Sequence, residues 1–341
     1  MNDWTPPGNW RRLTTIDAHA AGEPLRVVTE GFPELPGDTI LAKRRYAREH
    51  YDILRKTLVL EPRGHADMYG CVLTPPVTSD GDVGVLFLHN EGFSTMCGHG
   101  IIGLVKVGLD CGLIDADEKG RIRIDTPAGR VSATASIENG HVTGVSFLNV
   151  PSFVMALDEV IDVESLGEVR FDIAFGGAFY AYVDAPSLGI GLRGENTPEI
   201  IDAGMRIKHA VADRQLIRHP GGEPDLDFLY GTIFVEQIEA GDVHSRNVCV
   251  FAEGEVDRSP TGTGVSGRAA IHHARGELPA DEWITIESLI GTRFQVRVYE
   301  TTEVAGVSAV VPEVRGTAYI TGRNEFLIDP DDPLAEGFLL R

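Results

Sequence analysis

The stretch CGHGIIG at residues 97–103 recurs as TGTGVSG at residues 261–267, with glycines at the same three offsets. Each copy follows an apolar, strand-like run that ends in Glu-Gly, at residues 85–92 and 248–254. The two copies lie about half the chain apart, which favours two similar halves, each built from a strand, a glycine-rich turn and a helix. The alternative is a chance likeness between two glycine turns.

Short apolar runs between the many glycines predict sheets joined by turns. Strands are expected at residues 25–28, 58–60, 83–88, 121–124 and 142–147. Helices are expected at residues 34–52, 101–113 and 265–276. The helix at 101–113 is apolar on nearly every side, so it is expected to be buried. The boundary between the halves is placed near residues 165–170, and the fold class is α/β, rich in strands.

The chain has 341 residues and a formal net charge of −21. Such an acidic chain repels polyphosphate, so no nucleic-acid partner and no membrane partner is expected. The densest basic cluster, KRR at residues 43–45, is interpreted as a solvated face. The chain shows neither the apolar run of a secretion signal nor that of a membrane span, which predicts a soluble, cytoplasmic protein. Free thiols are expected because the cysteines are few and dispersed, at positions 71, 97, 111 and 249.

The first glycine turn places Cys97 at the start of a predicted helix. The unpaired N–H groups and the dipole of a helix start favour an anion by roughly 0.3–1 kcal/mol, so the thiol pKa is expected to move toward neutrality. Such a thiol is a candidate base. Gly98 and Gly100 allow a ligand close to the backbone, where the same amides can hold a carboxylate. The alternative is a buried structural cysteine, which is how Cys71 and Cys249 are interpreted.

Two further residues are candidates for a ligand site. His99 either donates a hydrogen bond to an anion or fills space beneath the turn. Asp257 precedes the second turn, and a carboxylate beside two sets of amides suits a zwitterion such as an amino acid. Its alternative roles are an Asx-type cap and an ion pair with Arg258. The histidines show no metal-ligand spacing, so no metal is expected.

Both turns also match G-x-G-x-x-G, the dinucleotide-binding pattern. Six residues separate the first motif from its strand, and both motifs come late in their halves, unlike a Rossmann turn. A nicotinamide oxidoreductase is therefore kept only as a rival. A second rival is a catalytically silent amino-acid-binding protein.

Five segments together resemble the proline racemase family, which includes hydroxyproline epimerases and dehydratases. They are IDAHAAGEP (16–24), PRGHADMYGCVLTPP (62–76), HNEGFSTMCGHG (89–100), FGGAFYAYVDA (175–185) and VFAEGEVDRSPTGTG (250–264). The resemblance implies two pseudo-symmetric halves, residues 1–168 and 169–341, with the last strand free to return to the first half. Each half would be a mostly antiparallel sheet wrapped around a central helix, similar to diaminopimelate epimerase, with the site in the cleft between them.

The resemblance also implies roles for individual residues, and no cofactor. Cys97 would be a catalytic base, and Asp257 would bind the substrate amine. The substrate carboxylate would be held by backbone amides of Gly98, His99, Gly262 and Thr263. The partner is then a small imino acid. The oligomeric state stays open, with a homodimer as one option.

The chain departs from the family's racemases and epimerases at Thr261, where they carry a second cysteine. A hydroxyl is not a base at neutral pH unless another group activates it. The enzyme should therefore be unable to move a proton between the two faces of the substrate Cα. A cysteine followed by a threonine is similar to the family's dehydratases, which act on trans-3-hydroxy-L-proline. Cys97 would remove the Cα proton, and loss of the C3 hydroxyl would give Δ1-pyrroline-2-carboxylate.

The stereochemistry of the substrate suggests a second role for Cys97. In the trans substrate the hydroxyl shares a ring face with the Cα hydrogen, so Cys97 could also return the proton to the departing hydroxide while Thr261 positions the ring. The remaining rival is epimerisation of 4-hydroxyproline or proline.

The chain departs from the family a second time at Ala20-Ala21, where a different residue pair usually precedes GEP. This change would alter substrate preference if the strand borders the substrate ring.

Overall fold

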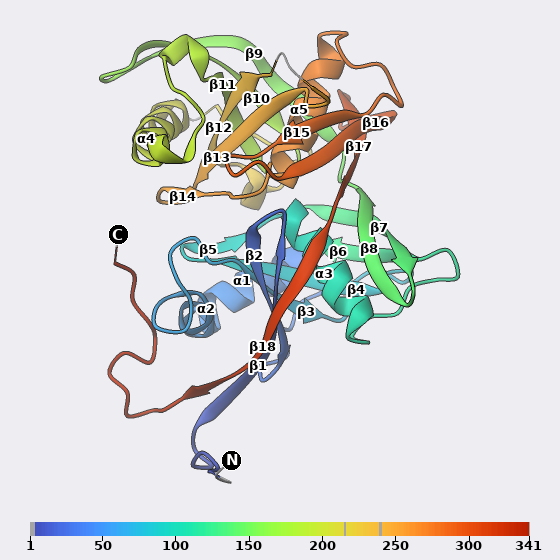
Figure 1. Ribbon diagram of the computed structural model, residues 1–341, viewed down its shortest axis with the longest axis vertical. Helices are drawn as coiled ribbons and strands as arrows, with labels where there is room; N and C mark the ends of the chain where they lie inside the picture. The colour runs from blue at the N-terminus through green and yellow to red at the C-terminus, as the bar shows by residue number, and fades with distance from the viewer. Residues whose placement is uncertain (1–3, 215, 239–240, 341) are drawn as a thin grey trace.

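The computed structural model describes residues 4–214, 216–238 and 241–340. Two lobes are stacked along the long axis, and the chain passes from the lower lobe to the upper one and back (Figure 1). The helices are α1 (Ile40–His50), α2 (Asp52–Val59), α3 (Gly98–Asp110), α4 (Thr197–Asp213) and α5 (Gly262–Ala274).

The strands divide between the lobes as Figure 1 shows. The lower lobe holds β1 (Arg11–Ala20), β2 (Glu23–Glu30), β3 (Gly70–Thr74), β4 (Val83–His89), β5 (Gly92–Ser94), β6 (Arg121–Thr126), β7 (Gly129–Glu138), β8 (His141–Leu148) and β18 (Ala318–Ile328). The upper lobe holds β9 (Ser152–Val163), β10 (Gly167–Phe175), β11 (Phe179–Asp184), β12 (Leu229–Gln237), β13 (Ser245–Phe251), β14 (Glu255–Val256), β15 (Ile284–Glu287), β16 (Arg293–Val304) and β17 (Val307–Gly316).

Most neighbouring strands pair antiparallel, and β2–β3, β4–β6, β11–β12 and β13–β15 pair parallel. β18 pairs with β1 along its length, so the end of the chain returns to the strand that begins it. The predicted fold class, an α/β fold dominated by strands, is confirmed. The division at residues 168 and 169 stays a prediction; β9 and β10 both lie in the upper lobe, and β17 also pairs with β8 of the lower lobe.

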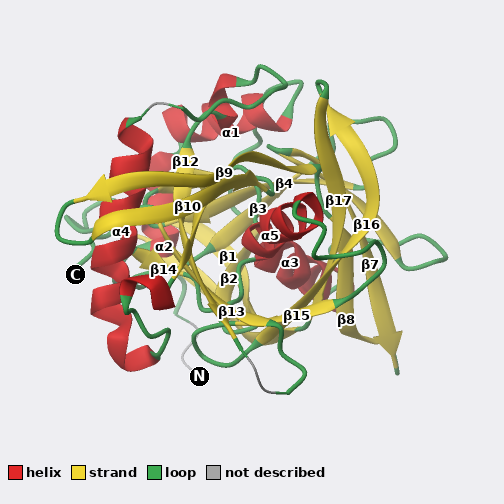
Figure 2. Cartoon of the chain, turned by 90° about the horizontal axis from the view of Figure 1, so that it is seen from above, coloured by secondary structure: helices red, strands yellow, loops and turns green. Residues whose placement is uncertain are grey.

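The helix α3 lies inside the lower lobe and α5 inside the upper lobe (Figure 1), and seen from above both lie at the centre of the molecule, enclosed by strands (Figure 2). Both are buried on nearly every side, as the apolar pattern of the first one predicted. They approach closely at their first residues, where a Cβ on Gly98 would lie 2.5 Å from the Cα of Gly262. Only glycine allows two backbones to approach this closely. The repeated turn therefore brings two helix starts to one point.

Several local predictions were wrong. Residues 58–60 were expected to form a strand, but Leu58 and Val59 end α2. Only Arg45 of the KRR cluster is solvated: Lys43 and Arg44 are buried, where the Lys43 ammonium donates to the Leu35 carbonyl and the Arg44 guanidinium donates to the Phe93 carbonyl. The helix expected over residues 34–52 begins only at Ile40, after Thr39 caps it by accepting the Ala42 N–H.

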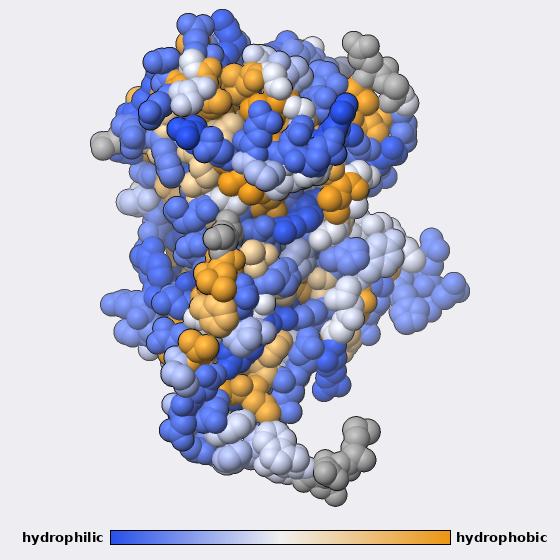
Figure 3. All heavy atoms as spheres, turned by 60° about the vertical axis from the view of Figure 1, so that its left-hand side comes forward, coloured by the Kyte–Doolittle hydropathy of each residue, from blue (hydrophilic) through white to orange (hydrophobic). Residues whose placement is uncertain are grey.

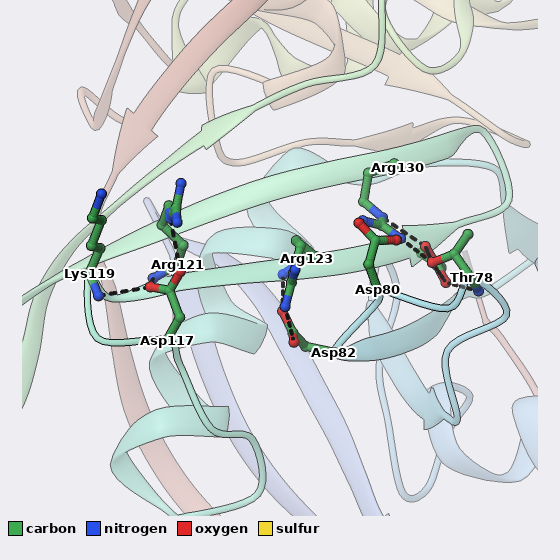
Figure 4. A network of polar contacts seen from close by, with 9 residues as sticks. Thr78, Asp80, Asp82, Asp117, Lys119, Arg121, Arg123 and Arg130 are labelled. Atoms are coloured by element: carbon green, nitrogen blue, oxygen red, sulfur yellow. Dashed lines mark hydrogen bonds and ion pairs between the residues drawn. The ribbon is translucent and has the colours of Figure 1, made fainter.

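Three arginines in one polar network of the lower lobe pair with aspartates (Figure 4). Arg121 bonds Asp117 at 2.9 Å, and Arg123 bonds Asp82 at 3.0 Å. Arg130 contacts Asp80 in the same network. Solvent-exposed pairs of this kind contribute little to stability. The paired aspartates do neutralise the charge of these three arginines.

The molecular face in Figure 3 is mainly hydrophilic, with hydrophobic residues in separate small groups. Within the described part of the chain, no helix combines the length and the apolar character needed to cross a membrane.

Candidate functional site

A small pocket lies where the starts of α3 and α5 meet. Both lobes contribute to it, because its lining comes from the two glycine turns and from strands on either side. The lining residues are Tyr69, Met96, Cys97, Gly98, His99, Tyr180, Tyr230, Cys249, Phe251, Asp257, Thr261, Gly262 and Thr263. The structure therefore brings all seven residues that the sequence singled out for catalysis or substrate binding into one pocket.

Cys97 is the N-cap residue of α3, and its side chain caps the helix. Its Sγ accepts the Gly100 N–H at 3.2 Å and lies 3.2 Å from Nδ1 of His99. Burial nevertheless raises the pKa of the thiol well above its usual value; the Gly100 N–H opposes this shift, and the negative charge of Asp257 adds to it. The expected move toward neutrality is therefore wrong for the ligand-free site, because desolvation exceeds the effect of the helix start.

His99 is buried beside this thiol. Burial lowers its pKa to about 3, although a hydrogen bond with the Pro24 backbone favours the charged form. The imidazole is therefore neutral at physiological pH and adds no positive charge to the pocket. It can bond the sulfur through one ring nitrogen.

Thr261 occupies the matching position in front of α5, but its conformation differs from that of Cys97. Its φ of 67° and ψ of 96° lie in a region that β-branched residues rarely adopt. Such backbone strain typically costs 1–3 kcal/mol and concentrates at functional sites. Unlike Cys97, Thr261 does not cap its helix. Its buried hydroxyl lies near the Asp257 carboxyl and the Cys249 thiol, whose pKa values it lowers, but it makes no hydrogen bond of ordinary geometry with the described residues. That hydroxyl can therefore turn to bond a ligand.

Asp257 is 5% exposed and forms the Asx-type turn that the sequence left open, because its Oδ1 accepts the Ser259 N–H at 2.7 Å. Burial raises its pKa to about 6, although the bonds from Ser259 lower it. The neighbouring Arg258 pairs with Asp67 at 2.8 Å and not with Asp257, so that alternative is wrong. The Arg258 N–H donates to the buried Glu23 carboxyl, which links the two lobes next to Asp257.

The first N–H groups of α3 and α5 have no acceptor within their own helices, as at any helix start. Gly98 and His99 begin α3, and Gly262 and Thr263 begin α5, so their amides gather at the pocket. The Thr263 hydroxyl lies 2.7 Å from the Tyr180 hydroxyl. The pocket thus offers backbone donors for an anion and one carboxyl group for a cation.

Sequence reasoning missed the walls of this pocket. Tyr69, Tyr180 and Tyr230 bring three phenols to it, and Phe251 adds an apolar wall. Cys249 is buried as predicted, but it also lines the pocket. Tyr69, Tyr180 and Phe251 lie inside family-like segments, which was the only available signal. Their positions in the pocket depend on the packing of the two lobes.

Two other expectations concern the Ala20-Ala21 pair and metal binding. Neither alanine of the Ala20-Ala21 pair is among the lining residues, so no direct contact with a ring follows from that departure. In the described ranges, no group of three or more histidine, cysteine or acidic side chains is arranged to hold a metal ion.

Comparison with known proteins agrees with this architecture. The family model described as "Proline racemase" matches residues 15–339. A trans-3-hydroxy-L-proline dehydratase from Colwellia psychrerythraea is 49% identical, covering 100% of this chain and 97% of that protein. A 3-hydroxyproline 2-epimerase from Burkholderia multivorans is 43% identical, covering 97% of this chain and 99% of that protein.

Solved structures show the same relationship. The crystal structure of a hydroxyproline epimerase from Agrobacterium vitis, with bound trans-4-hydroxy-L-proline, superposes with a TM-score of 0.91 at 34% identity. The match covers 98% of this chain and 96% of that one. On the match to the family model and on these relatives, the chain belongs to the proline racemase family.

Proposed function

We propose that this protein dehydrates trans-3-hydroxy-L-proline to Δ1-pyrroline-2-carboxylate, with Cys97 as the base. The observation that carries the proposal is the pairing of Cys97 with Thr261 at the starts of two touching helices. Two-base racemisation needs an ionisable acid or base on each face of Cα. Here one face has a thiol and the other a hydroxyl. The dehydratase relative, 49% identical over the whole chain, supports the same reaction.

The zwitterionic substrate fits the charges of the pocket. Its carboxylate would accept N–H bonds from the amides of Gly98, His99, Gly262 and Thr263, where two helix starts also favour an anion. Its ring ammonium would pair with Asp257, the pocket's acidic side chain. No lysine or arginine is among the lining residues, so binding of the carboxylate would rest on backbone dipoles.

Substrate binding would also activate the base. The charge of Asp257 is one cause of the raised pKa of Cys97. A bound ammonium neutralises that charge, and the Gly100 N–H continues to stabilise a thiolate. The thiol therefore becomes a stronger acid when the substrate is in place, and the thiolate then takes the Cα proton.

Removal of the Cα proton leaves a carbanion that either regains a proton or expels the C3 hydroxyl. Thr261 cannot deliver a proton quickly at neutral pH, so inversion at Cα is disfavoured and loss of water follows. The resulting enamine tautomerises to the cyclic imine. This chemistry needs no cofactor and no metal.

Epimerisation is the second candidate, because epimerases are among the similar proteins. Separate incubations with trans-3- and trans-4-hydroxy-L-proline distinguish the two, with imine formation and optical rotation followed together. Dehydration predicts imine from the trans-3 substrate. A change of rotation without imine would support epimerisation instead.

A further inference from the structure

Elimination of water needs a proton on the departing C3 hydroxyl, and the proposed function assigns no separate group to deliver it. We propose that Tyr69 is a catalytic residue that donates its phenol proton to this hydroxyl. The inference rests on the proposed dehydration and adds an acid to it.

Tyr69 lies close to Cys97 in the pocket. It immediately precedes β3, is 3% exposed and lines the pocket together with Cys97. Its ring packs edge-on against the His99 ring with centroids 4.8 Å apart, and His99 in turn contacts the Cys97 sulfur at 3.2 Å. The Tyr69 hydroxyl is also one of the groups that lower the pKa of the Cys97 thiol. The phenol therefore faces the same region as the sulfur.

Substrate stereochemistry places the leaving group in that region. The C3 hydroxyl of the trans substrate lies on the ring face that carries the Cα hydrogen. The base must approach from this face, so the hydroxyl is directed toward the Cys97 side. Thr261 would lie across the ring, where no group departs.

The environment of Tyr69 keeps its proton available. Burial raises the pKa of the phenol well above its ordinary value of about 10, and the neighbouring Tyr230 and Cys97 raise it further. A phenol is nevertheless a stronger acid than water, so transfer of its proton to a departing hydroxide is favourable. The acid is therefore protonated at every physiological pH and reacts only when the C–O bond breaks.

Two neighbouring hydroxyls would stabilise the phenolate that forms. The Tyr69 hydroxyl donates to Ser94 Oγ at 2.5 Å and lies 3.3 Å from the Tyr230 hydroxyl. When Tyr69 has lost its proton, both neighbours can donate to its oxygen.

The proposed step balances without another reactant. The Cα proton moves to the Cys97 sulfur, and the electron pair of that C–H bond forms the C2=C3 double bond. The C3–O bond breaks, its electron pair leaves with the hydroxyl, and the Tyr69 proton makes this group water. The new Cys97 thiol then returns a proton to the Tyr69 oxygen, which restores the thiolate and the phenol.

The test compares two leaving groups in the Tyr69→Phe variant. Fluoride leaves without protonation, and trans-3-fluoro-L-proline would give the same imine as the hydroxy substrate. General acid catalysis is typically worth 10²- to 10⁴-fold. We expect Tyr69→Phe to lose at least about 100-fold in kcat on trans-3-hydroxy-L-proline but less than about 10-fold on the fluoro substrate.

Two controls keep the test interpretable. Tyr182→Phe removes another buried phenol, one that bonds the Gly264 carbonyl outside the pocket lining, and should leave both reactions within a few-fold of the unmodified protein. Thermal unfolding confirms that each variant is folded. Equal losses on both substrates, or no loss on the hydroxy substrate, would overturn the role of Tyr69. If the unmodified protein makes no imine from either substrate, the proposed function itself fails.

Discussion

Gly98 and Gly262 begin the two central helices and meet backbone to backbone, with 2.5 Å between a Cβ built on Gly98 and the Cα of Gly262. This contact brings the first N–H groups of both helices to one pocket. It also places Cys97 and Thr261, the residues that precede these glycines, at the same site. The chemistry we propose depends on this contact.

A methyl group at Gly98 should therefore disrupt the site. We expect Gly98→Ala to push the two helix starts apart, to cost about 1–3 kcal/mol of stability and to abolish measurable turnover. Gly194→Ala is the matched control, because a Cβ there meets nothing within 4 Å. Denaturant unfolding and the imine assay test both variants. A Gly98→Ala protein with normal turnover would contradict this account of the contact.

The thiol of Cys97 should be indispensable. A serine hydroxyl has a far higher pKa than a thiol, so Cys97→Ser is expected to abolish imine formation while the protein stays folded. Cys71→Ser is the control: Cys71 is equally buried but lies in β3, outside the pocket lining. It should lose stability and keep its activity. Steady-state rates of both variants check this, and substantial turnover by Cys97→Ser would exclude the thiol as base.

Thr261 should position the substrate without ionising. Thr261→Ala is then expected to keep measurable dehydration, mainly with a raised KM. Thr261→Gly should in addition relieve strain at the φ of 67° and gain roughly 1 kcal/mol in the free energy of unfolding. Kinetics and thermal unfolding of the two variants separate these effects. Complete loss of turnover in Thr261→Ala would assign the hydroxyl a role in proton transfer.

Features set by residues close together in the sequence could be predicted. Features set by residues that meet only in the folded chain could not. The cores of α3 and α5 follow from glycine turns and apolar runs that lie within a few residues of each other. Residues 58–60 were misassigned because a run of three apolar residues cannot distinguish a strand from the end of a helix. Lys43 and Arg44 were misplaced because their acceptors, the Leu35 and Phe93 carbonyls, come near only in the folded chain.

The same difference between short-range and long-range contacts explains what could be predicted of the site. Its seven candidate residues lie in two short motifs, so they could be named before the fold was known. Tyr69, just before β3, and Tyr230, in β12, are far apart in the sequence, and their phenols meet only across the pocket. The direction of the Cys97 pKa shift was missed for a related reason: the helix start is a local effect, whereas desolvation by both lobes is not.

The Asp257 carboxyl should make both activity and stability depend on pH. Its pKa of about 6 means that the charged form, which binds the ammonium, is lost as pH falls through 6. We expect kcat/KM to decline about tenfold per pH unit well below this value. A profile that stays flat from pH 8 to pH 5 would contradict the assigned role.

The same carboxyl should reduce stability at neutral pH. Its pKa is about 3.9 when unfolded and about 6 when folded, so its favourable contribution is present below pH 4 and is lost as pH rises through 6. Asp257→Asn removes the buried charge and should stabilise the protein by about 2–3 kcal/mol at pH 7 while abolishing turnover. Denaturant unfolding at pH 4 and pH 7 checks this, because the gain should disappear at pH 4.

Proton NMR of the reaction with trans-3-hydroxy-L-proline in deuterium oxide tests the central claim most directly. The account predicts that the substrate signals are replaced by those of Δ1-pyrroline-2-carboxylate, with no accumulation of the Cα epimer. Accumulation of a Cα-deuterated epimer with its C3 hydroxyl intact, and no imine, would contradict it.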